Sequence, residues 1–270
     1  MGATPVYESP NLLTSTERKL LPIFPLDDGC ALPTSSLPLH IFAFPFRAMM
    51  NDVYSAHDKT GAERLIGVCM SDGKGGLAEI GTGLEIVDRV LKPDGRQFVS
   101  TVCRQRFKVL RVVQEEPYVV AEVEYGVEDC VVPSSDSTDD LSPELQASER
   151  EVYQYLVDIV SLSKTLGVYG KSTVEIPQKL LLLSPQRHAI RKSVCSLFSF
   201  ACSDFLNIEN SERQVLLQAP TLEFRLRRLR RTLQPSRDAL LQRMAEKEAR
   251  EAFGDGDGDS GGDGPVAAAA

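Results

Sequence analysis

Residues 84–125 read LEIVDRVLKPDGRQFVSTVCRQRFKVLRVVQEEPYVVAEVEY, and they decide the fold. Their β-branched and aromatic residues gather in short runs at close spacing, over 84–91, 98–103, 107–113 and 118–125. Pro93-Asp94-Gly95 predicts a tight turn between the first two runs, because Gly accepts a positive φ. Several short strands in such succession are typical of a small antiparallel barrel or sandwich.

More strands and one helix are predicted upstream of this stretch. Apolar runs cover residues 20–26, 37–42 and 65–70. The first run carries two prolines, which indicates an edge strand or an extended entry to the sheet, since proline donates no ladder hydrogen bond. Residues 47–57 predict a short helix with an apolar side made of Met49, Met50, Val53 and Tyr54. His40 lies in an apolar run and is interpreted as a hydrogen-bonded core histidine.

After an acidic stretch the pattern becomes helical. A proline near the first turn predicts a helix over 143–166, and a second helix is predicted over 185–205. Ser211 and Gln214 fit a capping box for a short third helix. The last helix is expected to be interrupted at Pro235, with a polar helix continuing from there to about Glu251. Its apolar seam is made of Leu222, Leu226, Leu229 and Leu233. Strands followed by helices indicate the α+β class.

Charge separates the parts of the chain that are expected to fold from those that are not. The chain has 270 residues and a net charge of −8, and residues 128–149 hold seven acidic residues and no basic one. Segments rich in acid, Gly, Pro and Ser cannot bury enough apolar surface to fold. The predicted divisions are a disordered N-terminus over 1–19, a β domain over 20–130, an acidic linker over 131–142, a helical bundle over 143–247 and a disordered acidic tail over 248–270. Without linker and tail the remainder is positively charged, so net charge alone does not exclude nucleic acid as a partner.

The sequence carries no motif that marks catalysis, a cofactor or a metal. Its six cysteines form no Cys-x-x-Cys pair and lie mostly in apolar runs, which is typical of small buried hydrophobes in a reducing compartment. Residues 165–172 resemble a phosphate-binding loop, but Thr165 replaces the first glycine, and a helix ending at Gly167 or Gly170 explains the pattern better. We therefore expect no catalytic residue, no cofactor and no metal. We also expect no membrane span, because no apolar run is long enough.

Two clusters are candidates for contact with a partner. The first is rich in aromatic residues and methionine, which suit an adaptable protein-binding surface where they are exposed. Its members are Phe42, Phe44, Phe46, Arg47, Met49 and Met50. The second is basic and would suit RNA or an acidic partner, unless its arginines pair with the acidic linker or tail. Its members are Arg225, Arg227, Arg228, Arg230 and Arg231. In an extended chain, Phe42, Phe44 and Phe46 of the first cluster would share one face.

A set of short motifs resembles the LON N-terminal domain family, the substrate-recognition part of ATP-dependent Lon proteases. In the first half these motifs are Leu21-Pro-Ile-Phe-Pro-Leu26, Leu37-Pro-Leu-His-Ile-Phe42, Arg47-Ala-Met49, Gly81-Thr82, Pro93-Asp-Gly-Arg96, Arg104-Gln-Arg-Phe107 and Tyr118-x-x-Ala-Glu-Val-Glu124. In the second half they are Ser199-Phe-Ala-Cys-Ser-Asp-Phe-Leu206, Glu212-Arg-Gln-Val-Leu-Leu217 and Arg225-Leu226 to Leu233. Their order and spacing carry the resemblance over residues 20–235.

The resemblance implies a PUA-like β-barrel followed by a helical bundle, and a role in binding proteins. Two positions depart from the family pattern. The usual Phe-Glu-Pro-Arg-Tyr-Arg reads Phe42-Ala-Phe-Pro-Phe-Arg47, so a Glu and an Arg are missing there. The usual Gly before the Arg-Gln-Arg-Phe motif is Cys103. The ATPase and peptidase modules that follow in Lon proteases are not present in this sequence.

The leading hypothesis is therefore a non-catalytic, soluble protein-binding module. Its expected partners are protein clients, or an adaptor of a protease or ubiquitin-ligase system, and its expected location is the cytoplasm, or an organelle if the natural N-terminus is longer. One alternative is an RNA-binding PUA-like module that uses Arg225–Arg231. The other is an enzyme whose site carries no recognisable motif.

Overall fold

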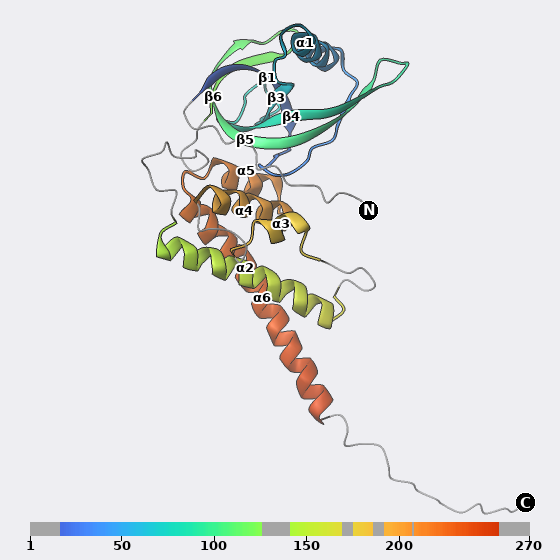
Figure 1. Ribbon diagram of the computed structural model, residues 1–270. Coiled ribbons are helices and arrows are strands. Elements are labelled where there is room, and N and C mark those ends of the chain that lie inside the picture. Colours follow the sequence, from blue (N-terminus) through green and yellow to red (C-terminus); the bar gives the residue numbers. More distant parts are fainter. Residues whose placement is uncertain (1–16, 126–140, 169–174, 186–191, 207, 254–270) are drawn as a thin grey trace, which may run out of the picture.

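The structure, a computed structural model, describes residues 17–125, 141–168, 175–185, 192–206 and 208–253. A β unit and a helical unit lie against each other, and the C-terminal part of the last helix projects away from both (Figure 1). The expected disordered N-terminus and tail and the acidic linker fall largely outside the described residues.

Five strands of the β unit close into a ring. They are β1 (Arg18–Asp27), β3 (Leu65–Ser71), β4 (Ile80–Leu91), β5 (Gln97–Gln114) and β6 (Val119–Tyr125). β1 pairs with β3, β3 with β4, β4 with β5, β5 with β6, and β6 with β1. The short β2 (Leu39–Ile41) adds to β5 outside the ring. The barrel is therefore antiparallel as predicted, apart from the parallel pair β1–β3.

β1 is not the edge strand that its prolines predicted. It pairs with β6 from Arg18 to Ile23 and with β3 from Ile23 to Asp27. Pro22 lies in the part paired only with β6, and Pro25 lies in the part paired only with β3. Each proline thus has a ladder partner on one side only, which is the position that a residue without an N–H tolerates.

The predicted runs 98–103 and 107–113 belong to one long strand, β5. The charged residues between them continue the ladder with β4, where Arg106 pairs with Thr82. β5 also exchanges partners along its length, from β2 and β4 to β6, and its registers shift at four places. Such shifts bend a strand, so that one strand can follow the curve of a closed barrel.

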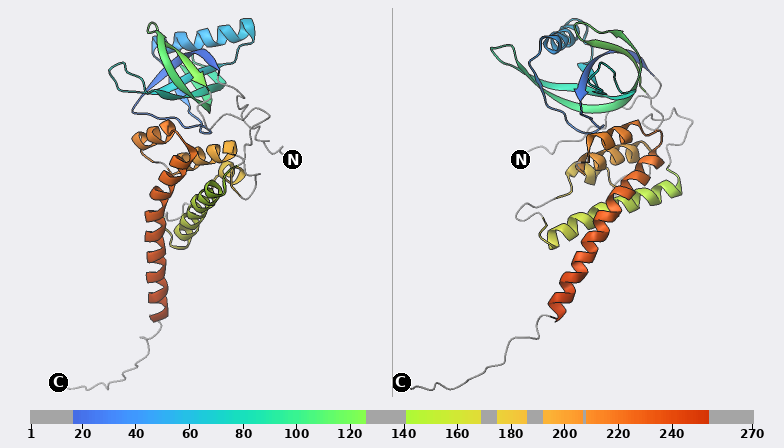
Figure 2. Two further views of the ribbon diagram at one scale, coloured as in Figure 1. Left: turned by 90° about the vertical axis from the view of Figure 1, so that its left-hand side faces the viewer. Right: turned by 180° about the vertical axis from the view of Figure 1, so that it is seen from behind.

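Helix α1 (Phe44–Thr60) closes the end of the barrel away from the helical unit (Figure 2). It begins earlier than predicted, because Pro45 fits the first turn of a helix. Met49, Met50 and Val53 are buried as the spacing predicted. They pack on barrel residues that include Ile66, Val68, Leu84, Ile86, Val99 and Cys103. Gly61 ends the helix in the left-handed conformation, with φ 69°.

The helical unit contains the predicted helices and one more. They are α2 (Pro143–Thr165), α3 (Gln178–Leu182), α4 (Lys192–Phe205), α5 (Asn210–Gln218) and α6 (Leu222–Phe253). The four seam leucines of α6 are each 1% exposed, which confirms their predicted role. The capping box is wrong, because Glu209 precedes α5 and no side chain caps it.

Helix α6 continues through Pro235 and beyond residue 247, where the bundle was expected to end. Two contacts with α2 support the turn that follows the proline. Arg237 donates to Asp158 at 2.7 Å, and its guanidinium lies 4.6 Å from the centre of the Tyr155 ring. Packing of this kind offsets the hydrogen bond that proline removes from a helix interior.

Glu149 of α2 is a buried carboxyl, and we expect it to make the stability of the protein depend on pH. Burial raises the pKa of its carboxyl, although the Cys195 thiol and Arg150 act in the opposite direction. When a carboxyl has a higher pKa in the folded than in the unfolded state, the free energy of unfolding of the protein falls as the pH rises through the folded-state pKa. We therefore expect Glu149→Gln to melt at a higher temperature than wild type at about pH 8, with a gap that closes toward about pH 4. A gap of equal size at both pH values would show that Glu149 does not titrate in this way.

Candidate functional site

An exposed aromatic patch lies on the outside of the barrel. It consists of His40, Phe42, Val90 and Phe98. The strand register places His40 of β2 opposite Phe98 of β5, and Phe98 opposite Val90 of β4. The His40 imidazole stacks on the Phe98 ring at 4.5 Å with an interplanar angle of 4°, and the Phe42 ring lies 5.7 Å from His40. Phe42 is 67% exposed and Phe98 is 42% exposed.

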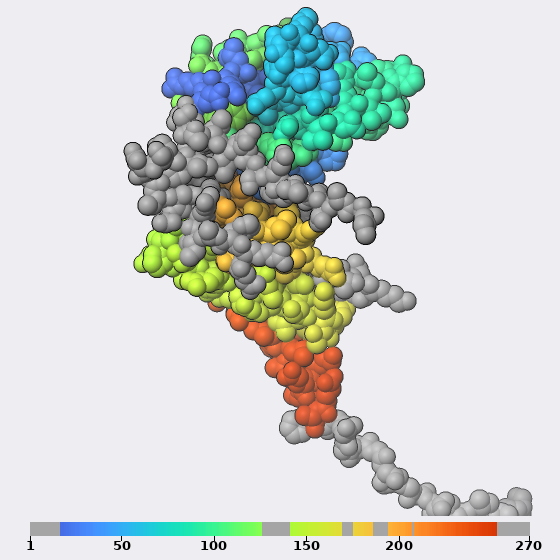
Figure 3. Space-filling view, viewed as in Figure 1, coloured from blue at the N-terminus to red at the C-terminus, as the bar shows by residue number. Residues whose placement is uncertain are grey.

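The patch extends from the β4–β5 hairpin toward the start of α1. These two segments lie side by side on one face of the β unit (Figure 3). Their contacts hold the hairpin in place, because Arg89 donates to Asn51 of α1 at 2.6 Å and stacks on Tyr54 at 4.5 Å. Arg47 lies so close over Gly95 that a Cβ there would approach its guanidinium to 2.5 Å. Phe44, the first residue of α1, is 68% exposed.

The aromatic cluster expected from the sequence divides between surface and core. Phe42 and Phe44 are exposed, and Phe46 is partly buried against Phe24, with ring centres 4.4 Å apart. Met49 and Met50 are fully buried under α1, so they are removed from the candidate contact surface. The shared face expected for 42, 44 and 46 does not form, because the helix begins at Phe44.

Sequence reasoning missed two members of the patch and misplaced a third. His40 is exposed and stacked on a ring, which corrects its interpretation as a core histidine. Phe98 and Val90 lie in strands that were predicted, but which of the two sides of the sheet they face was not predicted. Strand alternation is the signal that finds them, because Gln97 and Val99 on either side of Phe98 are both buried.

The basic cluster does not form one free surface. Arg225 is fully buried, and it donates to Ser199 at 2.9 Å and Ser196 at 2.8 Å. Three other arginines pair with carboxylates on helices rather than on the linker or tail. These pairs are Arg227 with Glu223, Arg228 with Glu212, and Arg230 with Glu151. The hydrogen bonds from Arg228 hold the pKa of Glu212 below its ordinary value. Of the five arginines in this cluster, only Arg231 is exposed and forms no ion pair with a described residue, which removes most of the support for an RNA site here.

A buried stack of charged and aromatic side chains joins the two units. The Phe200 ring of α4 contacts two guanidinium groups, that of Arg225 at 4.4 Å from the ring centre and that of Arg106 from β5 at 5.5 Å. Arg106 also donates to the carbonyl oxygens of Leu217 and Ala219, at 2.7 and 3.0 Å. These carbonyls lie at the C-terminal end of α5, where a cation is favourable. Arg106 is therefore a structural residue, not a ligand-binding one.

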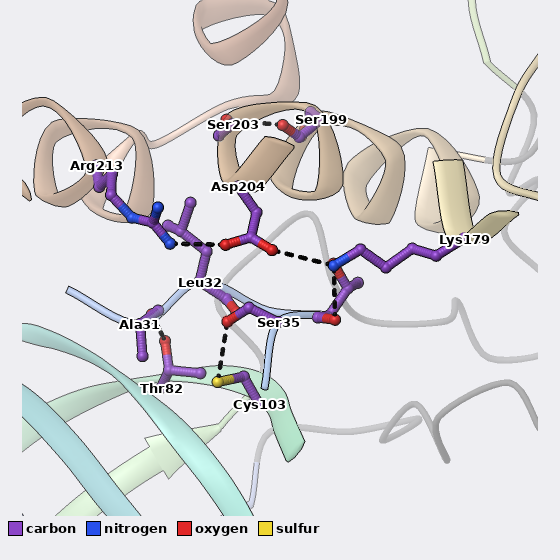
Figure 4. A network of polar contacts seen from close by, with 11 residues as sticks. Ala31, Leu32, Ser35, Thr82, Cys103, Lys179, Ser199, Ser203, Asp204 and Arg213 are labelled. Atoms are coloured by element: carbon purple, nitrogen blue, oxygen red, sulfur yellow. Dashed lines mark hydrogen bonds and ion pairs between the residues drawn. The ribbon is translucent and has the colours of Figure 1, made fainter. Parts of the chain in front are cut away.

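A polar network beside this stack fixes the orientation of the units (Figure 4). Asp204 of α4 accepts from Lys179 of α3 at 3.1 Å and from Arg213 of α5 at 2.8 Å. Lys179 also donates to the carbonyl of Thr34, in the loop between β1 and β2, at 3.1 Å. Gln214 adds a hydrogen bond to the carbonyl of Ile80. With both sides packed and bonded, this junction is a structural interface, and the exposed candidate surface lies on the β unit.

The described residues offer little for covalent or metal chemistry. Burial raises the pKa of Cys103 to about 11 and that of Cys30 and Cys69 to about 12, so these thiols stay protonated at neutral pH and are poor nucleophiles. Across the described ranges, no group of three His, Cys, Asp or Glu side chains could hold a metal ion. Within the same ranges, no helix has the length and apolar character to cross a bilayer.

The first residues of the segment that resembles a phosphate-binding loop form the C-terminal end of α2. α2 finishes at Thr165, and Gly167 follows in the left-handed conformation with φ 62°. The N–H groups of Gly167 and Val168 donate to the carbonyls of Lys164 and Ser163, which is the usual hydrogen-bond pattern of a glycine-terminated helix. The predicted helix end at Gly167 is confirmed, while residues 169–172 lie outside the described part.

Known proteins resemble this chain over most of its length. The model of the family described as the ATP-dependent protease La (LON) substrate-binding domain matches residues 20–234. A solved Lon N-terminal domain protein from Xanthomonas campestris is 24% identical, with a TM-score of 0.49, over 78% of this chain and 96% of that one. The N-terminal domain of the Mycobacterium avium complex Lon protease is 14% identical, with a TM-score of 0.52, over 80% and 98%. The second likeness supports the predicted α+β fold, a PUA-like barrel followed by a helical bundle.

Proposed function

Because the chain belongs to the Lon substrate-binding domain family, whose model covers both of its units, we propose that it is a receptor for protein clients. The aromatic patch binds apolar segments that unfolded or partly unfolded clients expose. The receptor then delivers these clients to a protease or ubiquitin ligase that acts in trans. The family match classes residues 20–234 as a substrate-recognition module, and the steps beyond recognition are the proposal.

The observation that carries the proposal is the joint exposure of Phe42 and Phe98 on one surface of the barrel. Aromatic rings stabilise a fold when they are buried, so exposed rings add little to stability. Large apolar side chains that are adjacent on a surface often mark a binding site. The patch is built on paired strands, so its side chains are held in place before a client arrives. A preformed surface loses less conformational entropy on binding.

Affinity for an unfolded client tests this function. A fluorescently labelled protein that stays unfolded after reduction and alkylation of its cysteines serves as the client, and its native, disulfide-bonded form is the control. We expect the full chain to bind the unfolded form in a saturable manner and the native form at least about tenfold more weakly, because native folding hides the apolar segments. Equal binding of both forms, or of neither, would contradict the proposal.

Delivery to a degradation system needs a separate measurement in cells. The chain fused to a proximity-labelling enzyme should enrich subunits of one protease or ligase over a matched fusion that carries Phe42→Ser and Phe98→Ser. Equal enrichment by both fusions would show that association with the protease or ligase does not depend on client binding at the aromatic patch, and it would contradict delivery of clients by this surface.

A further inference from the structure

A lysine without a carboxylate partner lies against the aromatic patch, and two arginines without such partners lie where α1 meets the β4–β5 hairpin. Lys92 lies over the Phe98 ring, with its Nζ 5.5 Å from the ring centre. Arg47 packs on Gly95 at the hairpin tip. The Arg89 side chain donates to Asn51 and lies over the ring of Tyr54. None of these three forms an ion pair with a carboxylate of the described residues.

Basic residues elsewhere on the barrel differ in this respect. Arg18 and Arg111 pair with Glu124 and Glu122 of β6, at 3.1 and 2.6 Å. Lys108 pairs with Glu79 at 2.8 Å, and Arg104 pairs with Glu85. These four cations are thus neutralised, although Lys59, Arg64 and Lys74, like the group beside the aromatic patch, form no ion pair with a described carboxylate.

The hairpin's own acidic groups do not neutralise this group. Asp94 accepts hydrogen bonds from the backbone and side chain of Arg96, which hold the pKa of its carboxyl below the ordinary value. Asp88 accepts from the backbone N–H of Arg89 at 2.8 Å. Asp94 is paired with Arg96, and neither carboxylate forms an ion pair with Lys92 or Arg47 among the described residues, so these two cations are left for charges from outside the molecule.

We propose that the aromatic patch selects client segments in which acidic residues flank apolar ones. The apolar side chains lie on Phe42, Val90 and Phe98, and the flanking carboxylates pair with Lys92 and Arg47. This selectivity rests on the proposed function and adds a substrate class to it. Complementary charge at the rim of an apolar surface guides association and excludes partners of the same charge.

A peptide fits these observations better than single-stranded RNA does. RNA bases bind to aromatic side chains through free ring faces. Here His40 already stacks on the Phe98 ring, and Lys92 lies over that ring. The aliphatic side chain of Val90, which is 47% exposed, suits apolar side chains rather than bases.

Three peptides with one apolar core test the charge preference. The core is flanked by acidic, neutral or basic residues, and each peptide carries the same fluorophore. The acidic peptide should bind about tenfold more tightly than the basic one in low salt, with the neutral peptide between them, because two exposed ion pairs contribute modestly. The difference should shrink at high salt, where exposed charges are screened.

Two variants assign this preference to the patch. Lys92→Glu should weaken the acidic peptide about fivefold and strengthen the basic one, since it reverses one contact. Arg231→Glu on α6 makes the same change of charge at an exposed site far from the patch, so it should change either affinity by less than about twofold.

The outcomes separate the selectivity from the proposed function. Equal affinity for all three peptides would overturn the selectivity and leave client binding intact, whereas binding of none would contradict the proposed function itself. An equal effect of Lys92→Glu and Arg231→Glu would also overturn the selectivity, because it would report only net charge. A single-stranded RNA that displaces the acidic peptide at lower concentration would reassign the surface to nucleic acid.

Discussion

Phe200→Ala is expected to lower the free energy of unfolding by about 3–5 kcal/mol, the usual cost of removing a fully buried ring. The ring is 0% exposed and contacts the guanidinium groups of Arg106 and Arg225. Its loss leaves a cavity where the two units meet and removes both cation–π contacts, each a favourable interaction in a desolvated setting. Urea denaturation followed by far-UV circular dichroism measures the change.

A matched phenylalanine on the neighbouring helix controls for this substitution. Phe224 is 37% exposed near the start of α6, and Phe224→Ala should cost less than about 1 kcal/mol. If Phe200→Ala cost no more than Phe224→Ala, the ring would not hold the barrel and the helical unit together. Hydrogen exchange should also rise at the junction, at Leu217 and Ala219, whose carbonyls accept from Arg106.

Phe42→Ser with Phe98→Ser is expected to weaken binding of an unfolded client by about tenfold or more. Aromatic side chains that anchor an interface commonly contribute 2 kcal/mol or more each, roughly a thirtyfold change in affinity. Both rings are substantially exposed, so the free energy of unfolding should change by less than about 1 kcal/mol per substitution. Fluorescence anisotropy with the labelled client measures the affinity, and thermal melting checks the fold.

Leu241→Ser is the control for loss of exposed apolar surface. Leu241 is 41% exposed and follows Pro235 on α6, the helix whose C-terminal part projects away from the barrel (Figure 1). Client affinity should stay within about twofold of wild type in this variant. Equal weakening by Leu241→Ser and the double variant would indicate nonspecific adhesion to any exposed apolar residue, and it would contradict a defined patch.

Local patterns were sufficient to predict most of the fold. The leucine seam of α6, the buried side of α1 and the order of strands before helices follow from spacing alone. The partners of β1 and the continuity of β5 could not be read in this way, because they depend on strands distant in sequence. Pro22 and Pro25 indicated an edge, and only the exchange of partners at Ile23 explains why they are tolerated.

The site was harder to predict than the fold, because exposure is a tertiary property. The stretch from Phe42 to Met50 has uniform apolar character, yet the helix start at Phe44 sends Met49 and Met50 into the core and leaves Phe42 outside. The arginines of α6 formed a single cluster in sequence, but a helix spreads neighbours over several faces, and the carboxylates of α2 and α5 occupy two of them. Phe98 joined the patch through strand pairing with His40, which no local pattern contains.

Site-specific photocrosslinking tests most directly whether the aromatic patch is the client-binding surface. A benzophenone amino acid replaces Phe98 in one variant and Leu241 in another, and each is illuminated with the labelled unfolded client. We expect a crosslinked product from position 98 that excess unlabelled acidic-flanked peptide suppresses, and little product from position 241. Strong crosslinking from position 241, with none from position 98 while client affinity persists, would contradict the account.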